Sequence, residues 1–465
     1  MTSLRSSLRQ AGADADPGPP EVTAEFSVCT RFRPQSPHQA NCGALRLLAI
    51  TFGTRGDVEP FLTLGSGLAE AGHEVRLVSH AMFDNLASGS GVEFVGSPGR
   101  GMREIIESEE AQEMMKSVGN PLTLPRRLEH LFGDDIDLLY ESVDEAARDV
   151  DAILAFPATF PALDVAELRG IPVVQIHHVP AMPTRAFPPA VNFVHRESLG
   201  RVGNRLAYSA DAAAATLAMR RPVNAARERV LRTRRRGVLG TLRQRNNFTG
   251  ALVGVSPHVL PPPPDWPANV ETCGYWWPRG VDAPPLNAEV SEFLDRDGPV
   301  IFFTLGSTAL DDPERITELV CGAARDAGVR LLLQRGWSGL GEGADSHDVM
   351  VVDDLAYPEL FDRVAAVVHH GGAGTTALGL RHGCPSLAIP AIADQFFWGH
   401  RMQALGVGPR PLGLKHLTQP ELAGRMSKLV EDQRYLERAT ILSNVLADED
   451  GVANAVAALD RMLDL

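Results

Sequence analysis

The chain has 465 residues, of which 44% are hydrophobic, and its formal net charge is -14. This composition excludes a wholly disordered chain, and the acidic balance argues against a nucleic-acid partner because backbone phosphates repel an acidic surface. No uninterrupted apolar stretch is long enough to span a bilayer, so we expect no stable membrane insertion. The five cysteines are scattered without CxxC spacing, and no signal-peptide pattern opens the chain, which favours a cytoplasmic location.

The first half of the chain predicts an α/β domain. Residues 1–43 lack periodicity and indicate a disordered N-terminal extension. From residue 44 onward, an apolar run is followed by a Gly-containing loop, a helical pattern that stops at Gly72 and a second apolar run. The same alternation recurs from residue 151. Alternating strands and helices imply a doubly wound parallel sheet, so we predict an N-terminal domain over 44–278.

A second alternating series follows a proline-rich stretch, in which proline disfavours both helices and central strands. We predict a linker over 279–297 and a second doubly wound domain over 298–440. The tail, 441–465, reads as an amphipathic helical segment that packs back on the first domain. Sites in such folds lie at the carboxyl ends of the strands, which places the natural site in a cleft between the two domains.

The stretch "HHGGAGTTALG" at 369–379 is typical of an anion site, since it joins an apolar strand to a helix. Small residues at a helix start let backbone N–H groups approach an anion, and the helix dipole favours negative charge there. His370, at the strand end, and Thr375, in the helix, can add hydrogen bonds to a phosphate. The role of His369 stays open between a ligand contact and a structural one. Metal binding is disfavoured because neighbouring strand residues point to opposite faces.

Two further loops carry candidate chemistry. Asp394 and Gln395, after the next predicted strand, can bracket the hydroxyls of a sugar, although Asp394 is equally able to cap a helix. Asp57, in "GTRGDVEPF", is either a general base or an N-cap with Pro60 in the first helical turn. The aromatic and proline-rich loop at 180–200 exposes apolar side chains and favours a binding surface.

Together, "GTRGDVEPFLTLGSGLAEAGHEVRLVSH" and "HHGGAGTTALGLRHGCPSLAIPAIADQFFWGHRMQALGVGPRPL" resemble glycosyltransferase family 1, the UDP-glycosyltransferase type. The branch that they resemble contains sterol 3-beta-glucosyltransferases and bacterial antibiotic-modifying enzymes. "AMPTRAFPPA", "GYWW" and "LQRGWSGL" add to the similarity, which spans about 44 to 440. The resemblance implies a GT-B fold, with two Rossmann-like domains that face a cleft and bind acceptor and donor respectively.

The same resemblance implies an inverting, metal-independent enzyme without a cofactor that transfers a hexose, with glucose favoured, from a UDP- or TDP-sugar. By position, Asp57 matches the catalytic base. The expected donor contacts are Ser307, Thr308, Trp337, Leu355, His370, Gly371, Gly372, Gly374, Thr375, Asp394 and Gln395. The expected acceptor contacts are His178, Met182, Phe187 and Phe193. "DDLAYPELF" departs from the plant pattern that stacks on uracil, so the nucleobase preference stays open.

Three alternatives share parts of this pattern. A sugar-nucleotide 2-epimerase has a similar fold but little use for the apolar loop at 180–195. A non-catalytic sugar-nucleotide-binding protein should lack a base such as Asp57. A metal-dependent transferase should carry Asp-x-Asp after a strand, whereas "DVD" at 149–151 precedes one. We expect a hydrophobic small-molecule acceptor, which the sequence does not rank among sterols, polyketides, macrolactams and flavonoids.

Overall fold

The computed structural model describes residues 43–100, 104, 124–157, 159–190, 198–278, 284–306, 308, 310–337, 339–353 and 355–464, without the side chains of 124–134. Of the predicted features, residues 1–42, Phe193 and Ser307 lie outside the described residues. The chain divides into two compact units, with boundaries after residues 282 and 447. The N-terminal unit also contains residues 448–464, and the C-terminal unit ends at Ala447.

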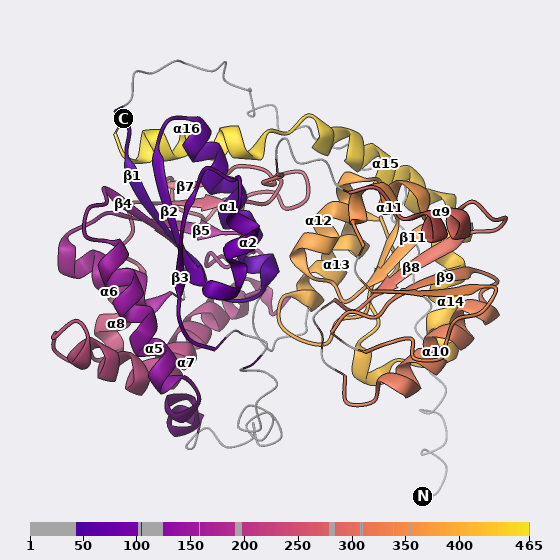
Figure 1. Cartoon of the computed structure of the whole chain (residues 1–465), viewed down its shortest axis with the longest axis horizontal. Helices are drawn as coiled ribbons and strands as arrows, with labels where there is room; N and C mark the ends of the chain where they lie inside the picture. The colour runs from indigo at the N-terminus through magenta and orange to yellow at the C-terminus, as the bar shows by residue number, and fades with distance from the viewer. Residues whose placement is uncertain are drawn as a thin grey trace, which may run out of the picture. The chain divides into compact units, whose positions relative to one another are not determined.

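The N-terminal unit is built on one parallel sheet of seven strands in the order β3-β2-β1-β4-β5-β6-β7 (Figure 1). The strands are β1 (Arg46–Ile50), β2 (Glu74–His80), β3 (Glu93–Ser97), β4 (Ala152–Ala155), β5 (Val173–His177), β6 (Gly250–Val253) and β7 (Val270–Thr272). The central strands β1, β4 and β5 are almost wholly buried, which explains their continuous apolar runs. The strand order reverses direction between β1 and β4, and this switch point is where ligands bind in such sheets.

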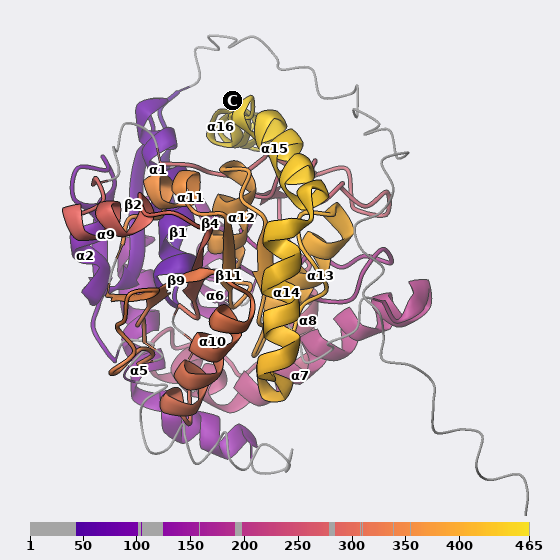
Figure 2. The same ribbon diagram turned by 90° about the vertical axis from the view of Figure 1, so that its right-hand side faces the viewer.

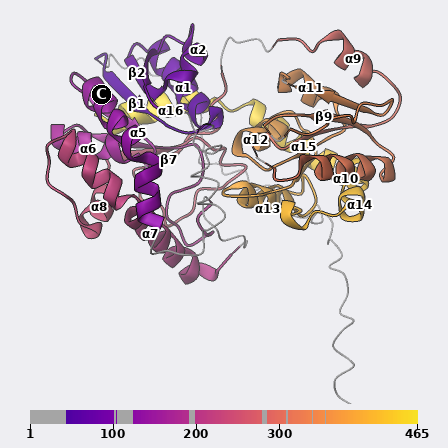
Figure 3. The ribbon, with the colours of Figure 1, turned by 60° about the horizontal axis from the view of Figure 1, so that its bottom comes forward.

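Helices cover both faces of this sheet. One face packs against α1 (Arg55–Glu70) and α16 (Gly451–Met462), and the other packs against α5 (Leu124–Ala146), α6 (Phe160–Arg169) and α7 (Gly200–Arg229). Figure 3 shows α8 (Val238–Arg245) on the same side as α6 and α7. The short η1 (Ala81–Phe83) and α2 (Asp84–Ala87) follow β2. As predicted, α6 stops at Gly170, which adopts a φ of 69°.

The C-terminal unit repeats the design with five parallel strands in the order β10-β9-β8-β11-β12. They are β8 (Val300–Thr304), β9 (Arg330–Gln334), β10 (Val349–Val352), β11 (Ala366–His369) and β12 (Ser386–Ala388). Here the switch point lies between β8 and β11, so the loops after these two strands mark the expected ligand position.

The helices of this unit again form two layers. Figure 2 shows α10 (Pro313–Asp326) beside α14 (Gln419–Glu431), and both contribute to the core on one face. The opposite face packs against α9 (Ala288–Leu294), α11 (Tyr357–Arg363) and α12 (Ala373–Arg381). The remaining elements are α13 (Gln395–Leu405), η2 (Leu414–His416) and α15 (Gln433–Ala447). Among the described residues, no helix combines the length and apolar character of a membrane span.

The last helix, α16, is an integral part of the N-terminal unit. A Cβ at Gly67 of α1 would lie 2.1 Å from Cγ1 of Val452, so the two helices meet where α1 has no side chain. Asn454 donates to the carbonyl of Cys273 at 3.0 Å, and Arg461 pairs with Glu271 at 2.5 Å. Glu449 lies two residues before α16, and its carboxylate accepts a hydrogen bond from the Ser256 hydroxyl at 2.5 Å.

Glu449 predicts a pH dependence of stability. Burial raises the pKa of its carboxyl to about 7 although the Ser256 hydrogen bond opposes the shift. Because the folded pKa lies above the unfolded one, the carboxyl stabilises the fold fully below its unfolded pKa, and this contribution is lost as pH rises through about 7. Glu449→Gln removes this titration, so its free energy of unfolding should decline less than that of the wild type between the ordinary pKa of 4.5 and about 7. The difference between the two proteins should reach up to ~3 kcal/mol.

Urea denaturation of both proteins at a series of pH values measures this slope. Glu437→Gln, at an exposed position on α15, is the matched control and should keep the wild-type slope. If Glu449→Gln declined with pH as the wild type does, Glu449 would not be the responsible group.

Candidate functional site

The loop after β1 presents Asp57 at the start of α1. Thr54 is the N-cap, and Asp57, three residues later, closes a capping box by accepting from the Thr54 N–H at 2.7 Å and its hydroxyl at 3.1 Å. Gly53 has a φ of 147°, and a Cβ there would lie 2.2 Å from Oδ2 of Asp57. The predicted N-cap role of Asp57 is wrong, because α1 begins at Arg55 and Pro60 lies beyond its first turn.

The other carboxylate oxygen of Asp57 meets a histidine from a distant part of the sequence. Nε2 of His178, the first residue after β5, lies 3.2 Å from Oδ1 of Asp57. Phe61 and Phe156 pack against the imidazole at centroid distances of 6.2 and 5.6 Å. Burial alone would raise the pKa of the Asp57 carboxyl, but the hydrogen bonds from His178 and Thr54 outweigh it and hold the pKa below its usual value.

This pair was not predicted, although the sequence contained a signal for it. His178 was expected to contact the acceptor, and the structure places it against Asp57. Both residues follow parallel strands of one sheet, whose carboxyl ends lie along the same edge. The neighbouring His177 is fully buried, and its Nε2 lies 3.2 Å from Oε1 of Gln175. Burial lowers the pKa of His177 to about 3, so it stays neutral inside the sheet.

The expected acceptor loop is held in a defined conformation. The carboxylate of Asp265 accepts from the Thr184 hydroxyl at 2.6 Å and from the Arg185 N–H at 2.8 Å. Met182 is buried inside this loop, whereas Phe187 is partly exposed. Phe187 is therefore the better placed of the two for contact with a ligand.

In the C-terminal unit, the predicted anion loop joins β11 to α12 as expected. Gly372 is the N-cap of α12 and has no side chain to satisfy the first backbone N–H groups. Gly371 adopts a φ of 88°, and a Cβ there would lie 2.7 Å from the Gln395 carbonyl oxygen. A Cβ at Gly374 would meet nothing within 4 Å, so the space beside the first helical turn is open. Thr375, in the same turn, is partly exposed.

The two histidines before this loop have different surroundings. His370 packs between glycines, since Cβ atoms at Gly306 and Gly372 would lie 2.8 and 2.4 Å from its ring. Nδ1 of His370 is buried without a hydrogen-bond partner in the protein, and burial lowers its pKa to about 4. A neutral imidazole with an unsatisfied nitrogen beside a helix N-terminus fits a phosphate ligand.

His369 is structural in this conformation. It is fully buried, and its Nδ1 accepts from the Gly371 N–H at 3.1 Å. The bond holds Gly371 in the left-handed conformation that turns the chain into α12. This bond gives His369 a structural role in supporting the loop.

The loop after β8 lies next to this anion loop. The Thr304 hydroxyl donates to Oε1 of Gln334 at 2.7 Å and accepts from the Gly306 N–H at 3.0 Å, which fixes the turn. Oγ1 of Thr308 is buried without a hydrogen-bond partner in the protein. Trp337 donates its backbone N–H to the Gly306 carbonyl at 3.1 Å and keeps 40% of its surface exposed. Leu355 instead packs against the core near α11.

Asp394 and Gln395 are placed at the start of α13, and both already have protein partners. Oδ2 of Asp394 accepts from the Trp398 indole at 2.9 Å, and Oε1 of Gln395 accepts from the N–H groups of Ala391 and Ile392 at 2.8 and 3.1 Å. Ala393, the residue directly before Asp394, has a φ of 52°, a strained conformation for a residue with a Cβ. Strain of this kind gathers at functional sites, and the two side chains hold this turn.

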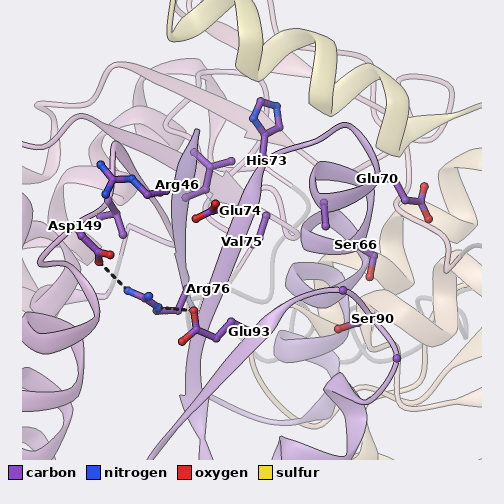
Figure 4. Close-up of a pocket in the computed structure, with 15 residues that line it drawn as sticks. Arg46, Ser66, Glu70, His73, Glu74, Val75, Arg76, Ser90, Glu93 and Asp149 are labelled. Atoms are coloured by element: carbon purple, nitrogen blue, oxygen red, sulfur yellow. Dashed lines mark hydrogen bonds and ion pairs between the residues drawn. The ribbon is translucent and has the colours of Figure 1, made fainter. Parts of the chain in front are cut away.

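A hollow of about 690 Å³ lies elsewhere in the N-terminal unit, at the amino ends of β1, β2 and β3 (Figure 4). Its charges compensate one another, since Arg76 pairs with Glu93 at 2.9 Å and with Asp149 at 3.1 Å. Ligands in doubly wound sheets bind at the opposite, carboxyl edge. Each unit therefore carries its own group of candidate residues, the Asp57–His178 pair in the N-terminal unit and the His370 loop in the C-terminal unit.

Two family models match parts of the chain. Residues 47–188 match the glycosyltransferase family 28 N-terminal domain, and residues 342–460 match the erythromycin biosynthesis protein CIII-like C-terminal domain. The sterol 3-beta-glucosyltransferase UGT80B1 of Arabidopsis thaliana is 32% identical over 96% of this chain and 71% of its own length. UGT80A2 of the same plant is 32% identical over 90% of this chain, which spans 66% of that relative.

Solved structures agree on the architecture. The glycosyltransferase of kitacinnamycin superposes with a TM-score of 0.62 at 19% identity, covering 90% of this chain and 99% of that one. The glycosyltransferase VinC, solved in complex with DTDP, superposes with a TM-score of 0.57 at 18% identity, covering 90% and 100% respectively. The predicted α/β GT-B fold with two doubly wound sheets is confirmed, and the fold and loops define a glycosyltransferase. The chain belongs to the family of the sterol 3-beta-glucosyltransferases.

The open space at Gly374 predicts a selective effect of Gly374→Ala on ligand binding. The methyl group meets no protein atom, and alanine favours the helix, so stability should hold or rise by ~0.5–1 kcal/mol. If an anionic group binds against this turn, the methyl group displaces it, and the affinity for UDP and TDP should fall by ~tenfold or more. Calorimetric titration together with thermal unfolding separates the two effects.

The matched control is Gly424→Ala, since a Cβ at Gly424 of α14 also meets nothing within 4 Å. This variant should bind both nucleotides as the wild type does. Unchanged nucleotide affinity in Gly374→Ala would mean that no ligand approaches the first turn of α12.

Proposed function

We propose that this glycosyltransferase moves a hexose, with glucose favoured, from a UDP- or TDP-sugar to a hydroxyl of a hydrophobic small molecule, with inversion at the anomeric carbon. The observation that carries the proposal is the Asp57–His178 pair, a carboxylate held by three hydrogen bonds at the switch point of a sheet. Membership of the sterol 3-beta-glucosyltransferase family supports a sterol-like or other natural-product acceptor.

The donor half of the proposal rests on the His370 loop. The N-terminus of α12 provides backbone N–H groups and a positive dipole for the diphosphate, and His370, Thr308 and Thr375 add hydrogen-bonding groups. As the sugar leaves, negative charge grows on the diphosphate, and donors aimed at that charge lower the barrier. The binding of DTDP by VinC, a protein of the same fold, supports a nucleoside diphosphate as the ligand.

In the acceptor half of the proposal, Asp57 and His178 have separate roles. Asp57 takes the proton of the acceptor hydroxyl while the oxygen attacks the anomeric carbon from the face opposite the leaving group. His178 does not take this proton in the proposed mechanism; its Nε2–H orients the carboxylate and keeps it ionised. Ser307 and Phe193 stay proposed contacts to donor and acceptor respectively, and Asp394 and Gln395 stay proposed contacts to the sugar.

Asp57→Asn tests the assignment of the base. The amide cannot accept the proton, so transfer should fall by at least ~10²-fold while UDP affinity stays near the wild-type value. Product mass after incubation with UDP-glucose, TDP-glucose and a panel of hydrophobic alcohols, with and without chelator, measures transfer. Glu59→Gln, two residues further along α1, is the control and should stay active. An active Asp57→Asn protein would overturn the base assignment.

His178→Ala tests the positioning role through pH. Loss of the Nε2–H removes a hydrogen bond that lowers the pKa of Asp57, so that pKa rises and the acid limb of kcat/KM moves to higher pH. We expect kcat to fall by ~tenfold, since the carboxylate is no longer oriented. His178→Gln, which keeps a donor, should recover part of the rate. An unshifted acid limb in His178→Ala would show that the histidine does not act through Asp57.

A further inference from the structure

Residues 200–245 carry a charge opposite to that of the whole chain. This segment contains α7 and α8 and holds twelve arginines against one aspartate and one glutamate, so its formal charge is +10 in a chain of net charge -14. The segment therefore carries a local excess of positive charge within an otherwise acidic chain.

Only part of this positive charge is used inside the protein. Arg227 and Arg236 both pair with the buried carboxylate of Asp164. Glu228 is the one exposed carboxylate of the segment, and it pairs with Arg235 at 2.9 Å. Nine arginines are exposed, namely Arg201, Arg205, Arg220, Arg221, Arg229, Arg232, Arg234, Arg235 and Arg243. Of these, Arg235 is paired with Glu228, and Arg229 pairs with Asp137 at 2.6 Å.

Three of the exposed arginines surround a hollow. Arg220, Arg221 and Arg235 line a space of about 370 Å³ together with Asn224 and Ala225. None of these lining residues is acidic, and the Asn224 side chain is bonded to the backbone of Arg236 at 3.1 and 2.7 Å. The chemistry of the hollow therefore favours a phosphate or another oxyanion.

Large apolar side chains lie exposed on the same helix. Val202, Leu206 and Leu217 of α7 have 72%, 63% and 51% of their surface accessible. At about 100° per residue, these three positions and Arg220 fall within an arc of about 60°, and they extend over about 27 Å of helix. Leu239 of α8 is also 72% exposed. We call Val202, Leu206, Leu217, Arg220, Arg221 and Arg235 the α7 face.

We propose that the α7 face docks on the surface of an anionic lipid bilayer. Apolar side chains of an interfacial helix gain free energy in the boundary between headgroups and acyl chains, and arginines beside them attract anionic headgroups. A nucleic acid would engage the arginines but leave the valine and leucines exposed, so the combination favours lipid. The docking is peripheral, since α7 is not apolar enough to count as a membrane span.

The opposite side of α7 holds the expected acceptor loop. Asn204 donates to the Arg185 carbonyl at 3.1 Å, and the Tyr208 hydroxyl donates to the Pro188 carbonyl at 3.4 Å. Docking through the α7 face therefore leaves this loop about one helix diameter, ~10 Å, from the lipid in which a hydrophobic alcohol is concentrated. This consequence rests on the proposed function, whereas the docking itself does not.

Co-sedimentation of the full chain with vesicles tests the docking. We expect binding to phosphatidylcholine vesicles that contain phosphatidylglycerol, weak binding to phosphatidylcholine alone, and a loss of binding at high salt. Arg220→Glu with Arg221→Glu should weaken the partition coefficient by more than ~tenfold, at ~fivefold for each arginine lost. Val202→Ser with Leu206→Ser should also weaken binding, because the apolar contribution is removed.

The matched controls lie on other surfaces. Arg148→Glu, at a side chain that is 65% exposed, and Leu436→Ser, on α15, should bind vesicles as the wild type does. All variants should keep the wild-type unfolding midpoint and the wild-type rate of transfer to an alcohol in free solution. A failure of transfer in solution would count against the proposed function and leave the docking result unaffected.

Three results would overturn the docking proposal. The first is absence of binding to both kinds of vesicle. The second is equal binding to neutral and anionic vesicles. The third is tight binding to a single-stranded oligonucleotide that the serine variants leave unchanged, which would make the α7 face a polyanion site.

Discussion

The candidate site depends on the fact that all strands of a parallel sheet end at the same edge. In the N-terminal unit this edge brings the loop after β1 to the residue that follows β5, so Asp57 and His178 meet across 121 positions of sequence. In the C-terminal unit it brings Gly306, after β8, against His370, after β11. Each strand order reverses beside these loops, which leaves space for a ligand between diverging helices.

Close backbone approach is the second constraint. Cβ atoms at Gly53, Gly371 and Gly372 would collide with the Asp57 carboxylate, the Gln395 carbonyl and the His370 ring respectively. At each of these positions the missing side chain lets a polar group sit directly against the turn. Gly371 and Gly372 therefore serve the packing of the loop itself, while Gly374 faces open space.

The two units use histidine in different electrostatic settings. Burial lowers the pKa of His370 to about 4, so this imidazole is neutral and offers a ligand hydrogen bonds rather than charge. His178 lies beside a carboxylate whose pKa it lowers, so its effect on that group is to keep it negative. The exposed arginines of α7 and α8 differ from both histidines, because the proposed docking depends on their summed electrostatic field rather than on one contact.

Local sequence patterns were sufficient to predict the strands, the helices and the loops between them. Continuous apolar runs predicted the buried strands, helical spacing and glycine stops predicted α1, α6 and α12, and the glycine cluster predicted an anion site at a helix start. These features depend on neighbours within a few residues, so the sequence displays them directly. Residue matches to the glycosyltransferase pattern then pointed to Asp57 and His370.

Long-range partners were decided only by the tertiary structure. The sequence left Asp57 between a base and an N-cap, and folding assigned the cap to Thr54 and gave Asp57 the His178 partner. Likewise, the sequence predicted that Asp394 and Gln395 contact a sugar, and folding added their bonds to Trp398 and to backbone N–H groups. The α7 face also appeared only on folding, because packing buries one side of that helix and leaves the other exposed. Sequence spacing determines which element forms, whereas burial and partner choice depend on residues that only the fold brings together.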